Sequence, residues 1–328
     1  MPTSPIVVGS SFYLNVGNNG SGVKDEYLRQ TRRWTEAVKA AGYRPFLELK
    51  HLGLVTRERL DELKSAVDLF TLHVQYLERP GKSNTTLNLV DPSDRAAIET
   101  DPQTANAFDL IRPALVSFHC GFSAVEIGTA PPGDHNYALT PVLSREETFS
   151  RINDSLDTVI SYFRRKGYAN RILIENLDYT SGGGLGCGSA YEHVCEKDFI
   201  LELLAKPEIG SLLDIAHSLI SANNLIRGYT PQHLARALYN SGKLAQIHLN
   251  APQREDGDVF DMHLPFYTDE DVVNTLRTIL RMHKNDTDRK DPLFITIEPS
   301  ASVCESDPEE AVYKQGCELL KLLKAVYG

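Results

Sequence analysis

Residues 212–218 read LLDIAHS, an apolar run that ends at Asp214 and is followed three residues later by His217. Similar short apolar runs recur along the whole chain. Runs of this length are typical of strands buried in a parallel sheet. The eight predicted strands cover residues 5–9, 44–49, 68–74, 114–119, 171–176, 210–215, 244–249 and 293–298.

Longer amphipathic stretches separate the predicted strands. In residues 27–41, Tyr27, Leu28, Trp34 and Val38 recur at helical spacing, which would place one apolar stripe against the sheet. A last helix is predicted over residues 308–326. An open doubly wound sheet would also alternate strands and helices, but the early glycines lack the GxGxxG spacing typical of that fold. We therefore predict an α/β protein, a (β/α)₈ TIM barrel formed by residues 1–328 as a single domain.

Composition narrows the classes of function. The net charge of −10 argues against a broad basic surface for nucleic acid. No apolar run approaches the roughly 18 residues that cross a bilayer, so no membrane association is expected. The N-terminal residues lack the pattern of a signal peptide, which predicts a cytoplasmic location. The five cysteines form no CxxC pair, which argues against a disulfide framework or a zinc ribbon.

Residues able to bind metal fall at the predicted strand ends. A TIM barrel builds its active site at the C-terminal ends of its strands, including the loops that follow them. The candidates are His73 in LFTLHVQY, His119 in LVSFHCGFS, Glu175 in ILIENLDY, Asp214 and His217 in LLDIAHS, His248 in QIHLNAP, Asp261 and His263 in the following loop FDMHLPF, and Glu298 in ITIEPS.

Any one such residue is more often a hydrogen-bonded structural group than a metal ligand. Together, however, the nine would place four carboxylates in one barrel mouth. Buried carboxylates cannot all stay ionised unless cations neutralise them. Imidazole nitrogens suit zinc or iron, and carboxylates can bridge two ions. The set therefore predicts a multinuclear site of two or three divalent metal ions.

These motifs resemble two groups of the xylose-isomerase-like TIM barrel superfamily. The D-x-x-H of Asp214 and His217 and the D-x-H of Asp261 and His263 resemble the trinuclear zinc site of endonuclease IV. Over roughly residues 68–275, the chain resembles the multinuclear non-heme iron-dependent oxidases of the methanobactin-biosynthesis type. The segments that carry this second resemblance, in order, are SFHCGFS, HNYALTPVLSREETFSRI, ILIENLDY, CEKDFILELL, LLDIAHSLISANN, IHLNAP and DMHLPF.

The resemblance to the oxidases implies iron as the metal, and oxidation of a cysteine in a peptide or small thiol that a partner protein delivers. At the metal site we expect catalytic roles for Glu175, Asp214, His217 and Glu298. His135 matches a loop histidine of the oxidase pattern, so the resemblance implies that it contacts substrate. Asn176 follows Glu175 directly, so it is a second candidate for substrate contact.

Two alternatives remain at this point. His217 stands where the oxidases usually have asparagine, and it favours a zinc-dependent, endonuclease IV-like phosphodiesterase. A sugar isomerase or epimerase, working with two ions such as manganese, is the third hypothesis, although nine candidate ligands exceed what it needs.

Overall fold

The computed structural model describes residues 5–16, 21–50, 54–76, 86–100, 102–130, 135–168, 172–180, 188–224, 230–255 and 258–328. Eight parallel strands form a closed barrel in the order β1-β12-β9-β8-β7-β4-β3-β2. Their bounds are Ile6–Tyr13 (β1), Arg44–Lys50 (β2), Phe70–Val74 (β3), Val116–His119 (β4), Ile172–Glu175 (β7), Ile209–Asp214 (β8), Leu244–Leu249 (β9) and Leu293–Ile297 (β12). All eight predicted strands are confirmed.

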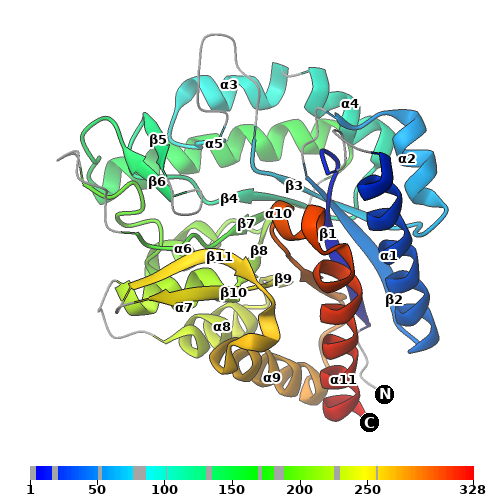
Figure 1. Ribbon diagram of the computed structural model, residues 1–328. Coiled ribbons are helices and arrows are strands. Elements are labelled where there is room, and N and C mark those ends of the chain that lie inside the picture. Colours follow the sequence, from blue (N-terminus) through cyan, green and yellow to red (C-terminus); the bar gives the residue numbers. More distant parts are fainter. Residues whose placement is uncertain are drawn as a thin grey trace.

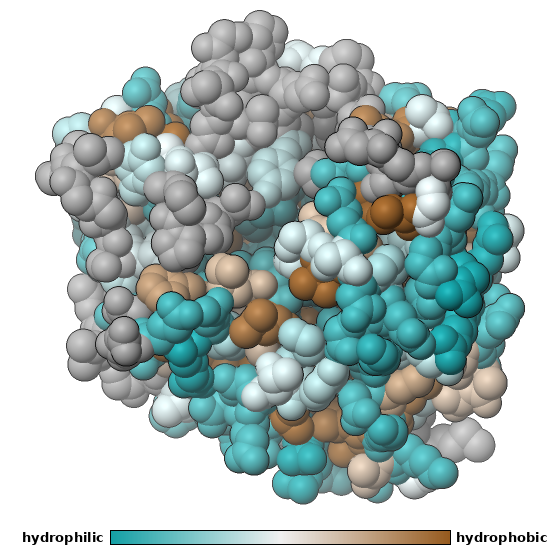
Figure 2. Space-filling view, viewed as in Figure 1, coloured by the Kyte–Doolittle hydropathy of each residue, from teal (hydrophilic) through white to brown (hydrophobic). Residues whose placement is uncertain are grey.

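Helices surround the barrel on its outer side (Figure 1). The larger ones pack one apolar face on the strands, as α1 does with Tyr27 and Trp34, which are both buried. Their bounds are Ser21–Ala40 (α1), Arg57–Lys64 (α2), Pro92–Thr100 (α3), Pro102–Ile111 (α4), Arg145–Arg165 (α5), Lys197–Leu203 (α6), Ile215–Asn224 (α7), Pro231–Asn240 (α8), Glu270–Asn285 (α9), Ala301–Ser306 (α10) and Gln315–Tyr327 (α11). The opposite faces of these helices are exposed to solvent, and hydrophilic side chains prevail over α1 and α2 in Figure 2.

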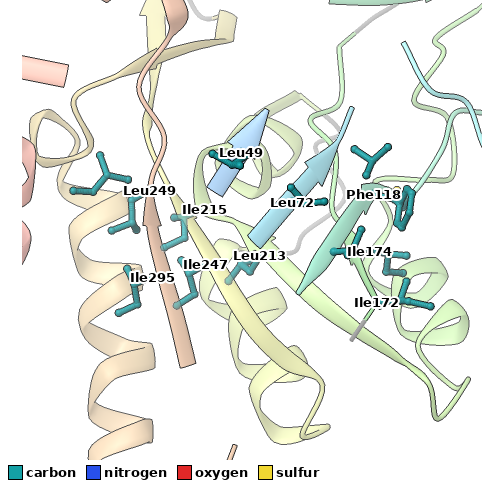
Figure 3. Packing of buried hydrophobic residues seen from close by; sticks show 14 of the residues in the cluster. Leu49, Leu72, Phe118, Ile172, Ile174, Leu213, Ile215, Ile247, Leu249 and Ile295 are labelled. Atoms are coloured by element: carbon teal, nitrogen blue, oxygen red, sulfur yellow. The ribbon is translucent and has the colours of Figure 1, made fainter. Parts of the chain in front are cut away.

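The strands sort their side chains between two apolar regions. Outward-facing residues such as Leu72, Ile174 and Ile247 pack in the large core between barrel and helices (Figure 3). Alternate side chains point into the barrel. There, Phe46 and Phe294 belong to a separate small apolar cluster. Further along the same strands, toward their C-terminal ends, the inward positions become polar, as at Glu48 and Thr296, which are both buried. This change from apolar to polar positions the functional site.

The structure corrects three details of the prediction. The first strand continues to Tyr13, four residues past the predicted end at Gly9. The last helix starts with a π-helical segment, η3 (Glu309–Lys314), before α11. Two antiparallel hairpins, which were not predicted, follow β4 and β9. They are β5 (Ile127–Ala130) with β6 (His135–Ala138), and β10 (Ala251–Glu255) with β11 (Asp258–Leu264).

A short 3-10 turn, η2 (Phe266–Thr268), joins the second hairpin to α9. Within the part of the chain that the structure describes, no helix is long and apolar enough to cross a membrane.

Candidate metal centre

Neighbouring strands bring the predicted residues to one end of the barrel. His119 on β4 pairs in register with Glu175 on β7, and Asp214 on β8 pairs with His248 on β9. Glu298 directly follows β12, and its backbone N–H donates to Leu249 beside it. Because all these strands are parallel, the side chains converge at the C-terminal mouth. All are buried.

The spacing D-x-x-H has a local cause. Helix α7 starts immediately after β8, and the Asp214 carboxylate caps it by accepting from the His217 backbone N–H at 2.8 Å. Because His217 lies in the first turn of α7, its side chain points back toward the barrel mouth. Asn176 holds the same strand end, because its amide donates to the Asp214 carbonyl and accepts from the Asp214 N–H, both at 2.9 Å.

Asp261 and His263 reach the mouth from β11, not from a loop as expected. Asp261 Oδ2 lies 3.0 Å from His263 Nε2 and 3.4 Å from His217 Nε2, so it bridges the two imidazoles. His263 has a φ of +48°, in the left-handed region that side chains other than glycine rarely adopt. This strained backbone turns the His263 ring toward Glu298, whose carbonyl accepts from Nδ1 at 3.2 Å.

Glu175 lies between two groups of potential ligands. Its Oε2 is 3.3 Å from His73 Nε2 and 3.6 Å from His119 Nε2, while its Oε1 is 3.3 Å from His248 Nδ1. In each of two sets of residues, the potential ligand atoms all lie within 4.8 Å of one another. The sets are His73, His119 and Glu175, and Glu175, Asp214, His248 and Glu298. Glu175 is shared, as expected of a carboxylate that bridges two ions.

Four of the histidines have one ring nitrogen fixed by the protein. His73 Nδ1 contacts Ser117 Oγ at 2.9 Å, and that hydroxyl donates to the Leu72 carbonyl, so the imidazole must be the donor. Carbonyls accept from Nδ1 of His217 and of His263, because a carbonyl has no proton to give. Glu48 accepts from His248 Nε2 at 2.9 Å. Each inner nitrogen is then available to a metal, with its tautomer set from outside.

Burial and neighbouring charges shift the pKa values of the site residues in different directions. Burial lowers the pKa of His73 to about 4 and of His119 to about 3, so both imidazoles are neutral at pH 7. Burial would also lower the pKa of His263, but Asp261 and Glu298 raise it to about 9. Burial raises the pKa of Asp214 to about 7.

The carboxyl groups of Glu175 and Glu298 behave in the opposite way. Burial would raise their pKa, but neighbouring imidazoles, His73 for Glu175 and His248 for Glu298, lower it below the usual range. Without metal, protons shared among carboxylates and imidazoles balance the charge of the site.

A cavity of about 320 Å³ opens onto the centre. His119, Glu175, His217, Asp261, His263 and Glu298 form one side of its lining. The remainder of the lining combines polar side chains, Gln75, Asn136, Asp178, Tyr191, Ser300 and Ser302, with the apolar side chains of Leu177, Met262 and Ala301. The volume is at the lower end of the range for ligand pockets, so a side chain of a larger substrate could enter it.

The predicted substrate contacts are placed differently. Asn176 is buried, and both the nitrogen and the oxygen of its side-chain amide are hydrogen-bonded to the Asp214 backbone. His135 is the first residue of β6, and its side chain lies outside the part of the chain that the structure describes.

Sequence reasoning missed Glu48 and Lys50 on β2. Glu48 accepts hydrogen bonds from Ser11 Oγ, Gln246 Nε2 and His248 Nε2, at 2.8, 2.6 and 2.9 Å. Lys50 contacts Glu298. The available signal was the pair of charged residues, two apart, within the buried run RPFLELK at 44–50. Because side chains alternate along a strand, both had to point to the same side of the sheet.

The residues present fit a metal cluster. Glu175 Oε2 and Asp261 Oδ1 are buried without a hydrogen-bond partner among the described residues, which is costly for a carboxylate removed from water. Ligand atoms around a tetrahedral ion are about 3.4 Å apart. The spacings of 3.3 and 3.6 Å between Glu175 Oε2 and the two imidazoles are close to that value.

Comparison with known proteins identifies the family. The family model described as "RiPP precursor modification enzyme MbnB/TglH/ChrH" matches residues 88–290, which is more than half of the chain. The chain belongs to this family. The resemblance inferred from the segments between SFHCGFS and DMHLPF is thus confirmed, and the protein is a member of a family of metal-dependent enzymes whose substrates are precursor peptides. No curated protein matches the sequence.

Solved structures agree on the fold. A sugar phosphate isomerase/epimerase from Parabacteroides distasonis has a TM-score of 0.51 at 9% identity, over 95% of this chain and 93% of that one. An AP endonuclease of family 2 from Brucella melitensis has a TM-score of 0.50 at 12% identity, over 91% and 93%. At these identities the likeness shows the TIM-barrel fold alone.

Proposed function

We propose that the protein is a multinuclear iron-dependent oxidase that modifies a cysteine of a precursor peptide. The observation that carries this proposal is the family match over residues 88–290. The matched region contains seven of the nine candidate ligands, all except His73 and Glu298, and also the segments that connect them. Connecting segments are not dictated by metal geometry, so their similarity favours shared chemistry over a shared ion.

The candidate ligands are His73, His119, Glu175, Asp214, His217, His248, Asp261, His263 and Glu298, with Glu175 between neighbouring ions. Bound iron would supply the electrons for reduction of dioxygen and the oxidising power for the thiol. The protein residues hold the iron, exclude water from the buried side of the centre, and leave the cavity as the entrance for the thiol. In the metal-free protein Asp214 and His263 share protons at neutral pH, and bound iron would displace these protons.

The substrate we propose is a peptide, bound with its cysteine in the cavity and its backbone along the polar lining near Asn136 and Tyr191. These two are already joined, because the Asn136 Nδ2 donates to the Tyr191 hydroxyl at 3.0 Å. A separate partner protein that delivers the peptide is part of the proposal. The cytoplasmic location and the weak affinity for nucleic acid stay predictions from the sequence.

The test is anaerobic reconstitution of the metal-free protein with Fe²⁺, followed by admission of oxygen in the presence of cysteine-containing peptides. We expect oxygen uptake that depends on the peptide, a change in absorbance, and loss of the free thiol. A serine peptide of the same sequence is the control. Iron-loaded protein that consumes no oxygen with any thiol peptide contradicts the proposal.

A zinc-dependent phosphodiesterase is the second candidate, favoured by one observation. His217, Asp261 and His263 are linked through Asp261 Oδ2, which is the arrangement expected for a further ion. Zinc-loaded protein that cleaves a duplex with an abasic site, with submicromolar binding, would put this function first. We expect no such binding, because the chain carries a net charge of −10. A sugar isomerase or epimerase is the remaining alternative from the sequence, and isomerisation of sugar phosphates is its assay.

A further inference from the structure

Lys50 is a buried cation that the proposed function does not use. It ends β2, is 2% exposed, and its ammonium contacts Glu298 Oε1. Lysine is almost never fully buried unless it is paired, because desolvation of its charge is expensive. Lys50 lies at the edge of the metal centre.

Glu298 divides its two oxygens between different partners. Oε1 faces Lys50, whereas Oε2 lies 2.7 Å from His248 Nδ1 and 3.4 Å from Asn250 Nδ2. The contact with Lys50 therefore fixes the rotation of the carboxylate. One oxygen remains for the centre, and it stands beside the inner nitrogen of His248.

The surroundings hold Lys50 in this position. In the pairing of β1 with β2, Lys50 is opposite Tyr13, and its ammonium is 5.4 Å from the centre of the Tyr13 ring. Lys50 is absent from the lining of the cavity that opens onto the centre. It is thus within reach of a ligand but out of reach of the proposed substrate.

Strand β2 acts on a second ligand in the same way. Glu48, two residues before Lys50 on the same face, accepts from His248 Nε2 at 2.9 Å. The strand contributes none of the nine candidate ligands, yet its anion orients His248 and its cation orients Glu298. The two ligands oriented in this way are adjacent.

We propose that Lys50 is a positioning residue for the metal centre, which limits Glu298 to one metal-facing oxygen and balances part of the charge of the buried carboxylates. The inference rests on the proposed metal site. It assigns Lys50 to metal binding and excludes it from substrate contact.

The test compares Lys50→Met, Glu298→Gln and the double variant, with Lys64→Met on the exposed face of α2 as the control. Anaerobic Fe²⁺ titrations against a chelator measure affinity and the number of ions, and thermal unfolding measures the metal-free proteins. We expect Lys50→Met to weaken the binding of at least one ion by about 10- to 100-fold. Lys64→Met should bind iron as the wild type does.

The double variant separates positioning from packing. Adding Lys50→Met to Glu298→Gln should lower iron affinity no further, since the carboxylate that Lys50 orients is already gone. The metal-free double variant should unfold at a higher temperature than Lys50→Met, because it leaves no unpaired buried charge. If Lys50→Met does not fold, folding of the double variant still supports the pair, whereas failure of both assigns Lys50 to packing and overturns the inference.

Iron affinity of Lys50→Met within twofold of the wild type, or additive effects in the double variant, would also overturn it. These outcomes are distinct from failure of the proposed function. In that case the wild type itself would bind no iron, or the iron-loaded wild type would consume no oxygen with any thiol peptide.

Discussion

The surroundings of three site histidines, His217, His248 and His263, favour a second proton on each ring in the metal-free protein. Burial opposes this proton, but neighbouring carboxylates raise each pKa above its ordinary value, to about 9 for His263. A metal ion must displace the proton from the inner nitrogen. We therefore expect Fe²⁺ binding at pH 7 to release protons, and the apparent affinity to increase as the pH rises toward 9.

Calorimetry in buffers of different ionisation enthalpy, under anaerobic conditions, measures the protons released. His233→Gln, which changes an exposed histidine on α8, is the control and should release as many as the wild type. An affinity that is constant from pH 7 to 9, with no dependence on buffer, would show that these imidazoles bind no metal.

The sequence indicated the side chains that meet at the barrel mouth better than the residues that hold them in place. Histidines and carboxylates at strand ends are visible because a barrel places functional groups there. Glu48 lies inside a strand, where charge usually indicates the solvent face of a sheet. Only the closed barrel shows that the inward face near the C-terminal end is polar. Asn176 was expected to contact substrate, but its hydrogen bonds to the Asp214 backbone depend on the distance between two strands, which no sequence pattern shows.

At the scale of elements, the strands were predictable and the hairpins were not. The strands are apolar runs between amphipathic stretches, and burial on both faces produces that pattern. Hairpin β10–β11 has mixed composition, because it lies over the mouth and combines exposed residues with Asp261 and His263. Its pairing is also irregular between Ala251 and Gln253. From the sequence alone, such a segment is predicted to be a loop.

Gly9 tests the packing between β1 and β2. A Cβ at this position would lie 2.3 Å from the Phe46 carbonyl oxygen and 2.6 Å from the Phe46 ring, so either β1 or Phe46 must move. We expect Gly9→Ala to lower the free energy of unfolding by about 1–3 kcal/mol in urea titrations. Gly22→Ala in α1 is the matched control, because its Cβ meets no atom within 4 Å. Equal stability of the two variants would show that the barrel adjusts at β1.

His283 tests the packing of α9 against α11. Its Nδ1 donates to the Tyr327 hydroxyl, which donates to the Leu280 carbonyl. Its Nε2 is buried without a hydrogen-bond partner among the described residues. Protonation would place an unpaired N–H⁺ in the interface. Burial accordingly lowers the pKa of His283 to about 4.

The unfolded chain binds this proton at a higher pH than the folded protein, so His283 makes stability fall as the pH drops from about 6.5 toward 4. Between pH 7 and 5, we expect the free energy of unfolding of His283→Gln to fall by about 1 kcal/mol less than that of the wild type. Urea titrations at both pH values measure it. Identical pH dependence in the two proteins would place the ring in contact with water.

At the scale of the whole molecule, the strands of one barrel come from both ends of the chain. β1 pairs with β12, 293–297, so the ring closes only when the first and last strands meet. A single domain over residues 1–328 stays a prediction from the sequence. We expect the metal-free protein to unfold in one cooperative transition, seen at the same midpoint by circular dichroism and by Trp34 fluorescence. Two separated transitions would indicate independent units.

Metal should raise that midpoint, because ions bound only by the folded barrel stabilise it by about 2.7 kcal/mol at a free concentration 100 times the Kd. Magnesium, which prefers oxygen ligands, should raise it less than iron or zinc. An unchanged midpoint with all three metals would contradict binding to the folded state.

The number of iron ions bound per chain tests the central claim most directly. Anaerobic titration of the metal-free protein with Fe²⁺, followed by removal of loose metal and elemental analysis, should give about two or three ions. Asp214→Ala, His217→Ala, Asp261→Ala and His263→Ala should each retain about one ion fewer, while His233→Ala retains them all. One ion or none in the wild type, or full iron content in the four site variants, would contradict the account.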